Sequence, residues 1–302
     1  MNFTCHSETG KIKSLFIKNA TQAFISDKHI DKYWKQLNYL SKPDINKAID
    51  EYKHFESILQ QQGAEIFHLP QDESVNMDSV YCRDAAIATN NGMIICNMGK
   101  AARMNEPLAE KKAFEANGIA VLGAITAPGT VEGGDVAWLD EHTLAVGNTY
   151  RTNEEGIRQL TALLQPMNVQ VITVALPHYK GSSDVFHLMS ILSPVDTNLA
   201  VVYSPLMPIV FRNLLLQRGS GISALRRNHA RDLPALDPDP RRCCPDCRGC
   251  GFRQSRLFVV GASCRWCPDG RCGHQAPRRR AIRRVPPDWN RGLICYLAAA
   301  GF

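Results

Sequence analysis

The chain has 302 residues and a formal net charge of +6, but its two ends contribute to that charge very differently. Residues 1–218 hold 19 Lys and Arg against 23 Asp and Glu, whereas residues 219–302 hold sixteen Arg and six Asp, with neither Lys nor Glu. The basic balance therefore comes from the tail and does not indicate a basic folded core. The length allows one large domain or two ordinary ones.

Lys11, Lys13 and Lys18 interrupt the apolar residues near the N-terminus, and no small-residue cleavage site follows them. This pattern differs from that of a secretory signal peptide, and no transmembrane segment is indicated. Residues 1–218 hold three Cys, too few for a disulfide framework in a chain that can form a core. We therefore expect a cytoplasmic protein with no membrane partner.

An earlier unit is also predicted, with a strand at residues 14–17, a helix at residues 44–62 and a strand at residues 65–69. Asp44 suits a helix N-cap and Gly63 suits a helix end. The apolar residues of the helix keep to one face, which predicts packing against a sheet.

Units of strand, strand, helix and strand follow. The first has strands at residues 85–89 and 93–97, a helix from Pro107 to Gly118 and a strand at residues 119–122. The next has strands at residues 136–139 and 144–146, a helix at residues 153–164 and a strand at residues 169–176.

The third has strands at residues 188–192 and 199–203 and a helix at residues 207–218. No closing strand is recognised after it, so this unit is predicted to be truncated. Repeats of this kind stack or close into a ring.

Polar residues gather where each unit begins. Asp78 and Asp84 flank the start of the first hairpin, Glu132 and Asp135 precede the second, and His187 opens the third unit. A site between stacked units would bring these residues together. Carboxylates can hold a planar guanidinium through paired charge-assisted hydrogen bonds.

Arg103 and Arg151 lie near these groups in the pattern and suit the anionic end of the same ligand. An ordinary structural interpretation exists for each residue. Gly133 and Gly134 could form a tight turn, the acidic residues could be solvated caps, and His187 could be a core or turn histidine.

Four segments together resemble a known group of enzymes. They are residues 78–84 (DSVYCRD), residues 132–135 (EGGD), residues 151–156 (RTNEEG) and His187-Leu188. In this order they resemble the guanidino-group-modifying superfamily of dimethylarginine dimethylaminohydrolases, arginine deiminases and amidinotransferases. The resemblance covers about residues 10–218 and is nearest to the dimethylarginine dimethylaminohydrolases. It implies an α/β fold of the pentein type, a fivefold pseudosymmetric ring of ββαβ units, here incomplete.

The resemblance also implies roles for individual residues. His187 matches the general acid and base, and Glu132 matches a catalytic residue that helps to bind the guanidinium. A Cys near the C-terminus would attack the guanidino carbon, and water would resolve the covalent thiouronium intermediate. The reaction needs neither a metal nor a cofactor. The implied substrate-binding residues are Asp78, Arg83, Asp84, Arg103, Asp135 and Arg151.

Two departures bear on the substrate. Arg83 stands where hydrolases of methylated arginine usually carry Glu, and Arg-Asp here is similar to arginine deiminases. Met189 stands where deiminases and amidinotransferases usually carry Asp, which favours the hydrolases. We predict hydrolysis of a methylated arginine to citrulline and an alkylamine, with an arginine deiminase or amidinotransferase as the alternative. The partner is a small guanidino compound, and a homodimer is one option.

The tail lacks the Gly-rich stretch and Cys-Leu-Thr or Cys-Met-Ser motif in which the family carries its nucleophile. Cys295 lies at about the right distance from the C-terminus but has no glycine run before it. The nucleophile is therefore not identified, and we predict little or no turnover. We interpret residues 219–302 as a disordered, Arg- and Cys-rich translation of a wrong reading frame, joined to an enzyme domain at residues 1–218.

A different interpretation makes the tail a module of its own. Four of its cysteines have the paired spacing of a tetrahedral zinc site: Cys247, Cys250, Cys264 and Cys267. The surrounding Arg would then make the chain a zinc-dependent nucleic-acid-binding protein. The wrong-frame hypothesis instead predicts no metal and no nucleic-acid partner.

Overall fold

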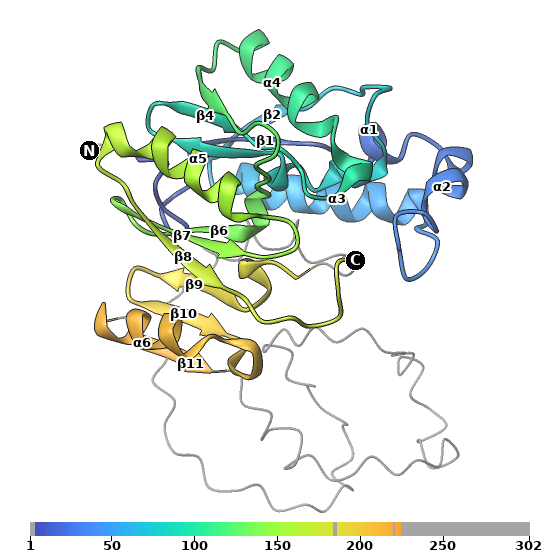
Figure 1. The fold of residues 1–302 in the computed structure, drawn as a ribbon. Helices are drawn as coiled ribbons and strands as arrows, with labels where there is room; N and C mark the ends of the chain where they lie inside the picture. The colour runs from blue at the N-terminus through green and yellow to red at the C-terminus, as the bar shows by residue number, and fades with distance from the viewer. Residues whose placement is uncertain (1–3, 184–185, 220, 225–302) are drawn as a thin grey trace, which may run out of the picture. The chain divides into compact units, whose positions relative to one another are not determined.

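A computed structural model describes residues 4–183, 186–219 and 221–224 of the chain. These residues form four small sheets, each built from segments that follow one another in the sequence (Figure 1). Helices alternate with the sheets along the chain, so the predicted α/β class is confirmed. The fivefold ring stays a prediction, because the described part of the chain supplies four sheets.

The first sheet is the parallel pair of β1 (Ser14–Ile17) and β2 (Glu65–His68), with Ser14 opposite Glu65. Between them lie α1 (Ala20–Phe24), α2 (Asp27–Tyr33) and α3 (Ile45–Gln61). The strands and α3 confirm the prediction. The two short helices were not predicted, because five and seven residues are too few to establish a helical period.

Local signals set the limits of α3. The Asp44 carboxylate accepts hydrogen bonds from the backbone N of Asn46 and Lys47, and Gly63 follows the helix at φ +77°. The helix has 17 residues, and none of the helices in the described part is both long and apolar enough to cross a bilayer.

The second sheet contains β3 (Ala86–Thr89), β4 (Gly92–Ile95) and β5 (Val121–Ala124). β4 pairs antiparallel with β3 and parallel with β5, and α4 (Glu106–Ala116) forms the crossover. This is the predicted strand, strand, helix, strand unit, although β5 begins two residues later than the sequence pattern indicates.

The third sheet repeats this arrangement with β6 (Val136–Asp140), β7 (Thr143–Asn148) and β8 (Gln170–Ala175). β7 pairs antiparallel with β6 and parallel with β8, and α5 (Glu154–Leu164) forms the crossover. The predicted order of elements in this unit is confirmed.

The fourth sheet contains β9 (Leu192–Asp196), β10 (Leu199–Val202) and β11 (Gly221–Ala224), with α6 (Ile209–Gln217) before β11. The prediction of a truncated unit is wrong, because β11 pairs in parallel with β10 from Leu199 opposite Gly221 onward. The predicted lack of structure after residue 218 is therefore also wrong for these four residues. The remainder of the predicted tail lies outside the described residues.

The predicted strand at residues 188–192 is wrong as well. Residues Leu188–Ser190 form a short 3₁₀ helix, and β9 begins at Leu192 and includes Pro194. β9 lies at the edge of its sheet, where a proline without an N–H group is tolerated. A proline usually interrupts a strand, so the sequence pattern predicted a strand that ends before Pro194 and placed it too early.

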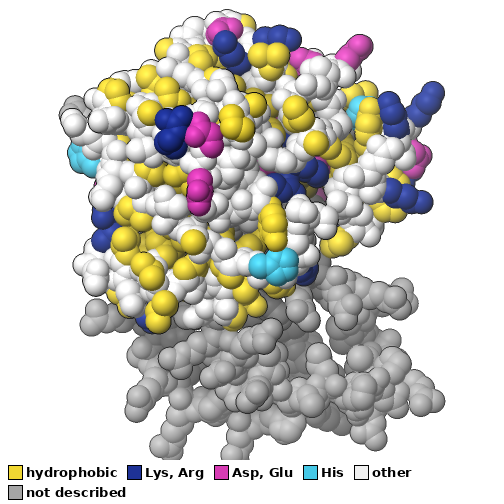
Figure 2. All heavy atoms as spheres, in the orientation of Figure 1, with side chains coloured by type: hydrophobic (Ala, Val, Ile, Leu, Met, Phe, Trp, Pro, Cys, Tyr) yellow, Lys and Arg dark blue, Asp and Glu magenta, His cyan; other side chains and the backbone are white. Residues whose placement is uncertain are grey.

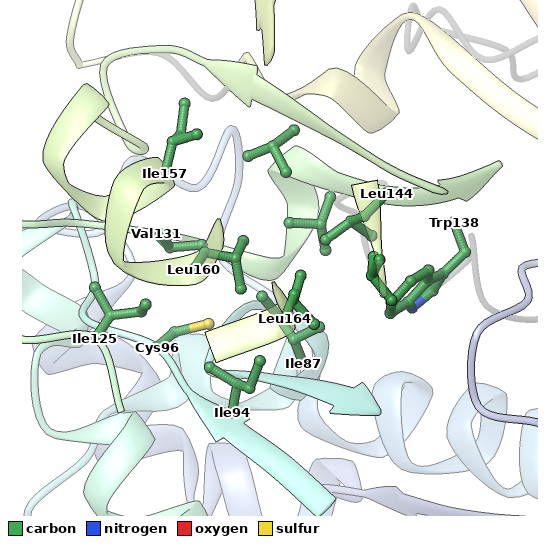
Figure 3. Close-up of a cluster of buried hydrophobic side chains, with 13 residues drawn as sticks. Ile87, Ile94, Cys96, Ile125, Val131, Trp138, Leu144, Ile157, Leu160 and Leu164 are labelled. Carbon is green, nitrogen blue, oxygen red and sulfur yellow. The ribbon is translucent and has the colours of Figure 1, made fainter. Parts of the chain in front are cut away.

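Buried apolar side chains join neighbouring units. Between the second and third sheets, Ile87 and Ile94 from β3 and β4 belong to one cluster with Leu144 from β7 and Leu160 and Leu164 from α5 (Figure 3). A second cluster joins the third and fourth sheets and the segments next to them through Ala137, Leu188, Leu192, Val202 and Phe211. These contacts fix the segments that begin each unit against one another.

Asn153 connects the start of α5 to the loop that leads to β6. Its side-chain oxygen accepts hydrogen bonds from the backbone N of Gly156 and Thr130, at 2.8 and 3.0 Å. Its side-chain nitrogen donates to the carbonyl of Pro128 at 2.8 Å. Asn153 therefore acts both as an N-cap and as a tie between two segments.

We expect Asn153→Ala to lower the free energy of unfolding by about 2 kcal/mol, because a cap and two loop hydrogen bonds are lost together. Asp44→Ala removes an exposed cap alone and should cost about 1 kcal/mol. Urea denaturation of both variants measures the difference. Equal losses would show that the loop bonds of Asn153 add nothing.

Candidate functional site

The site is built around Glu132, whose side chain is fully buried just before the 3₁₀ turn Gly133–Asp135. One carboxylate oxygen lies 2.9 Å from Nε2 of His187. The other accepts a hydrogen bond from the backbone N of Lys100 at 2.9 Å and lies 3.4 Å from a guanidinium nitrogen of Arg151. Segments from three units therefore converge on one carboxylate, as the predicted site between units requires.

Glu132 and His187 hold opposite charges at neutral pH. Burial alone lowers the pKa of His187, but the charge of Asp135, the hydrogen bond with Glu132 and the charge of Asp84 raise it to about 9. Burial raises the pKa of Glu132, but the hydrogen bond and charge of His187 and the charge of Arg151 lower it to about 2. The pair is therefore an imidazolium and a carboxylate.

Asp135 fixes the segment that carries His187. One carboxylate oxygen accepts a hydrogen bond from the backbone N of Leu188 at 3.0 Å, and the other accepts from the Thr149 hydroxyl at 2.7 Å. Burial raises the pKa of Asp135 to about 6, although the charge of His187 and these hydrogen bonds oppose the rise. The predicted ligand-binding role of Asp135 stays a prediction.

Gly134 allows His187 and Asp84 to approach the same stretch of backbone. A Cβ atom at Gly134 would lie 2.3 Å from Nδ1 of His187 and 2.9 Å from Oδ1 of Asp84. Both distances are too short for any side chain. The glycine in this motif is therefore required by packing at the site, and the turn interpretation alone does not explain it.

Arg103 lies between two carboxylates and is 5% exposed. Its guanidinium donates to Oδ2 of Asp84 at 2.6 Å, to both oxygens of Glu106 at 2.7–3.0 Å, and to the carbonyl of Tyr81 at 3.0 Å. Burial raises the pKa of Glu106 to about 7, while Arg103 opposes the rise. The predicted contact of Arg103 with a ligand carboxylate stays a prediction, and it would compete with these bonds.

Arg83 pairs with Glu8 from the N-terminal segment, at 3.0 and 3.1 Å from the two carboxylate oxygens. The same guanidinium reaches the carbonyl of Val136 at 3.4 Å, and Glu8 accepts from the backbone N of Trp138 at 3.1 Å. The pair therefore covers the outer edge of β6. The substrate-binding role predicted for Arg83 stays a prediction.

Asp78 is buried and forms an ion pair with Lys100, whose Nζ lies 2.6 Å from Oδ2. Lys100 was not predicted as a site residue, and neither were Glu106 and Glu8. The spacing of Arg103 and Glu106 at i and i+3 on helical backbone is a signal that could have identified Glu106. No sequence signal pairs Lys100 with Asp78.

The described cysteines do not suit a nucleophile. Burial raises the pKa of Cys82 to about 12 and the pKa of Cys96 well above its ordinary value, whereas an attacking thiol needs a lowered pKa. Cys5 is exposed. Cys295 and the four predicted zinc ligands lie outside the described residues: Cys247, Cys250, Cys264 and Cys267. Among the residues that the structure describes, no three His, Cys, Asp or Glu side chains are placed to share a metal ion.

We expect Gly134→Ala to displace the His187 ring, because the added methyl group would overlap Nδ1. Overpacking of this kind costs about 1–3 kcal/mol of unfolding free energy, measured by urea denaturation. Adding His187→Gly to Gly134→Ala should recover part of that loss by removing the overlapping ring. A neutral effect of Gly134→Ala would contradict this packing.

Stability should decrease as the pH rises from 6.5 to 9. The pKa of His187 is raised above its ordinary 6.5, so its contribution is complete below pH 6.5 and is lost as the pH passes 9. The unfolding free energy should fall by at most about 3 kcal/mol over this range, measured by urea denaturation at each pH. His187→Gln should remove this slope, and His54→Gln, an exposed change on α3, should keep it. An unchanged slope in His187→Gln would contradict the assignment.

Comparisons with known proteins agree with this geometry. Residues 19–218 match the family model described as N,N dimethylarginine dimethylhydrolase, eukaryotic. The chain is 31% identical over 161 residues to an N(G),N(G)-dimethylarginine dimethylaminohydrolase of Pseudomonas aeruginosa, over 53% of this chain and 60% of the relative. It is 29% identical over 177 residues to one of Streptomyces coelicolor, over 58% and 65%. The chain thus spans less than two thirds of the length of these relatives.

Two solved structures share the fold. A histidine-to-glycine variant of dimethylarginine dimethylaminohydrolase, solved as an adduct with S-methyl-L-thiocitrulline, has a TM-score of 0.56 and 25% identity, covering 72% of this chain and 78% of that chain. The N-terminal domain of a cyanobacterial arginine dihydrolase has a TM-score of 0.58 and 15% identity, covering 72% and 77%. The family match extends over most of the chain, with the Glu132, Asp84 and His187 cluster inside it. The chain belongs to the N,N-dimethylarginine dimethylhydrolase family.

Proposed function

We propose that residues 1–218 derive from a hydrolase that acts on the guanidino carbon of a methylated arginine and forms citrulline and an alkylamine. The observation that carries this proposal is the buried Glu132 and His187 pair, with Asp84 beside it, inside the stretch that matches the family model. Two relatives of the chain are named dimethylarginine dimethylaminohydrolases.

The charges of the site suit this chemistry. A guanidinium is a flat cation, and Oδ2 of Asp84 already binds one, the side chain of Arg103, at 2.6 Å. Oδ1 of the same carboxylate lies beside Gly134, on the side where Nδ1 of His187 lies. With a pKa of about 9, His187 carries a proton at neutral pH that it can give to the departing amine. The resulting neutral imidazole could then accept a proton from the attacking water.

The attacking thiol of this reaction has no candidate among the described residues, because burial raises the pKa of Cys5, Cys82 and Cys96. The family match ends at residue 218, where the composition changes. We infer that the wrong reading frame begins near this point and removes both the nucleophile and the unit that would complete a fivefold ring. The chain should then bind a guanidino ligand without converting it.

Arginine deiminase activity is the second candidate, because Arg83-Asp84 is similar to that branch and an arginine deiminase of Limosilactobacillus reuteri is 24% identical over 185 residues. The cytoplasmic location, the absence of a nucleic-acid partner and the option of a homodimer remain proposals. Zinc analysis of the purified full chain, with and without chelator, tests the alternative role of the tail.

We expect the full chain to bind Nω,Nω-dimethylarginine in calorimetry, and Asp84→Asn to weaken binding at least about tenfold by removing one charge-assisted contact. Glu115→Gln, an exposed carboxylate change on α4, serves as the matched control. A folded wild-type chain that binds neither dimethylarginine nor arginine would refute the proposal.

Incubation with dimethylarginine or arginine, followed by citrulline measurement, separates the branches. We expect no citrulline above the level of a His187→Gln control, because the thiol is missing. Turnover that disappears in Cys295→Ser would place the nucleophile in the tail and overturn the inference of a disarmed site. Turnover of arginine alone would favour the deiminase.

A further inference from the structure

Residues 4–8, which we call the strap, lie against the turn between β3 and β4. The side-chain oxygen of Asn90 in that turn accepts a hydrogen bond from the Thr4 hydroxyl at 3.1 Å and one from the backbone N of Cys5 at 2.6 Å. The Thr4 hydroxyl in turn accepts one from the backbone N of His6 at 3.0 Å. These contacts bring His6 to the tip of the hairpin.

The His6 ring joins the hairpins of the second and third sheets. His6 is 3% exposed, and its ring stacks on that of Trp138 in β6, with the ring centroids 3.9 Å apart and the planes 10° from parallel. Nε2 lies 3.1 Å from the backbone N of Asn90. Nδ1 lies 2.8 Å from the carbonyl oxygen of Glu141, in the turn between β6 and β7.

These two contacts require the ring to be neutral. A backbone N–H can only donate, so Nε2 of His6 must accept from Asn90 with a lone pair. A carbonyl can only accept, so Nδ1 must carry the proton that it donates to Glu141. Protonation of Nε2 would place a second N–H group against that of Asn90, so the hydrogen bond would become a repulsive contact.

The elements that pack against the ring provide no counter-ion for an imidazolium. In the described part of the chain, no carboxylate forms an ion pair with His6. The turn at residues 89–92 carries no charged side chain. On the other turn, Asp140 is paired with Arg218, and the side chains of Glu141 and His142 are exposed, so solvent screens their charges.

The Glu8 carboxylate is the last contact of the strap. It binds the Arg83 guanidinium at 3.0 and 3.1 Å and accepts a hydrogen bond from the backbone N of Trp138 at 3.1 Å. β6 is an edge strand of the third sheet, and Arg83 directly precedes Asp84 of the candidate site. Opening of the strap would therefore remove a carboxylate beside the site and uncover an N–H group of an edge strand.

We propose that the strap is an acid-sensitive device controlled by His6. The neutral ring holds the strap against the two hairpins, and protonation of the ring releases it together with the Glu8 and Arg83 ion pair. Histidine is suited to this role because its charge changes between about pH 5 and pH 8. The inference goes beyond the proposed function and does not depend on it.

Cleavage of the full chain by a protease that cuts after Glu tests the proposal. Glu8 is 6% exposed, so cleavage after it requires an open strap, whereas Glu73 is exposed and corrects for the activity of the protease at each pH. Glu110 in α4 is 6% exposed and reports unfolding of the whole domain. Residues 219–302 contain no Glu and add no cuts. Cleavage after Glu8, relative to Glu73, should rise at least about tenfold when the pH falls from about 7.5 to about 5, with Glu110 uncut.

Two variants assign this response to His6. His6→Gln has an amide that can accept and donate but does not titrate, so its cleavage ratio should change less than about twofold between the two pH values. His6→Phe keeps an aromatic ring for stacking and lacks both hydrogen bonds, so it should be cut after Glu8 at both pH values. His54→Gln, an exposed change on α3, is the matched control and should keep the wild-type response.

The contrary outcomes are equally specific. A wild-type ratio that does not change with pH overturns the proposal, and so does a response that persists in His6→Gln, because it would come from another group such as Glu8. Cleavage after Glu110 at the rate of Glu8 would show general unfolding and would also overturn it. If His6→Gln does not fold, NMR of the ring nitrogens in the wild-type chain decides. The neutral tautomer with the proton on Nδ1 supports the proposal, and a proton on Nε2 at about pH 7.5 overturns it.

Discussion

Burial of the Glu132 carboxylate is the constraint on which the site depends. An isolated buried carboxylate costs several kcal/mol, so Glu132 can stay ionised only while its partners are in place. Those partners are the His187 ring, the Lys100 backbone and the Arg151 guanidinium, which come from separate units of the chain. Apolar clusters between the same units hold the partners in position, because Leu188, next to His187, is itself a core residue. The packing between units therefore stabilises the core and determines the geometry of the site at the same time.

Local signals in the sequence predicted most of the fold. The helices α3 and α5 were located to within a residue at each end, because Asp44 and Asn153 are caps that act on their own first turn. The errors occurred where the fold overrides local preference. Pro194 lies inside β9 because that strand is at a sheet edge, and β11 forms because β10 offers it a pairing partner.

The site was predictable as a set of positions but not as a set of pairs. Residues at the start of each unit were expected to meet, and Glu132 and His187 do meet. The partners of the flanking charges were not predicted, because they lie far apart in sequence: Arg83 pairs with Glu8, and Lys100 with Asp78. Such pairs depend on loop geometry that no periodicity encodes. Arg103 shows the consequence, since its guanidinium is committed to Asp84 and Glu106.

The strand β11 forms beyond the end of the family match. Strand pairing and catalysis therefore place different requirements on the sequence. Strand pairing uses backbone N–H and C=O groups, which nearly every residue supplies, and the edge of β10 offers a template for them. Residues beyond the family match can therefore extend the fourth sheet by a four-residue strand. A nucleophile instead needs one thiol, with a lowered pKa, beside His187. Backbone order after residue 218 therefore does not by itself indicate a nucleophile, because strand pairing needs only backbone groups, whereas the reaction needs one particular side chain.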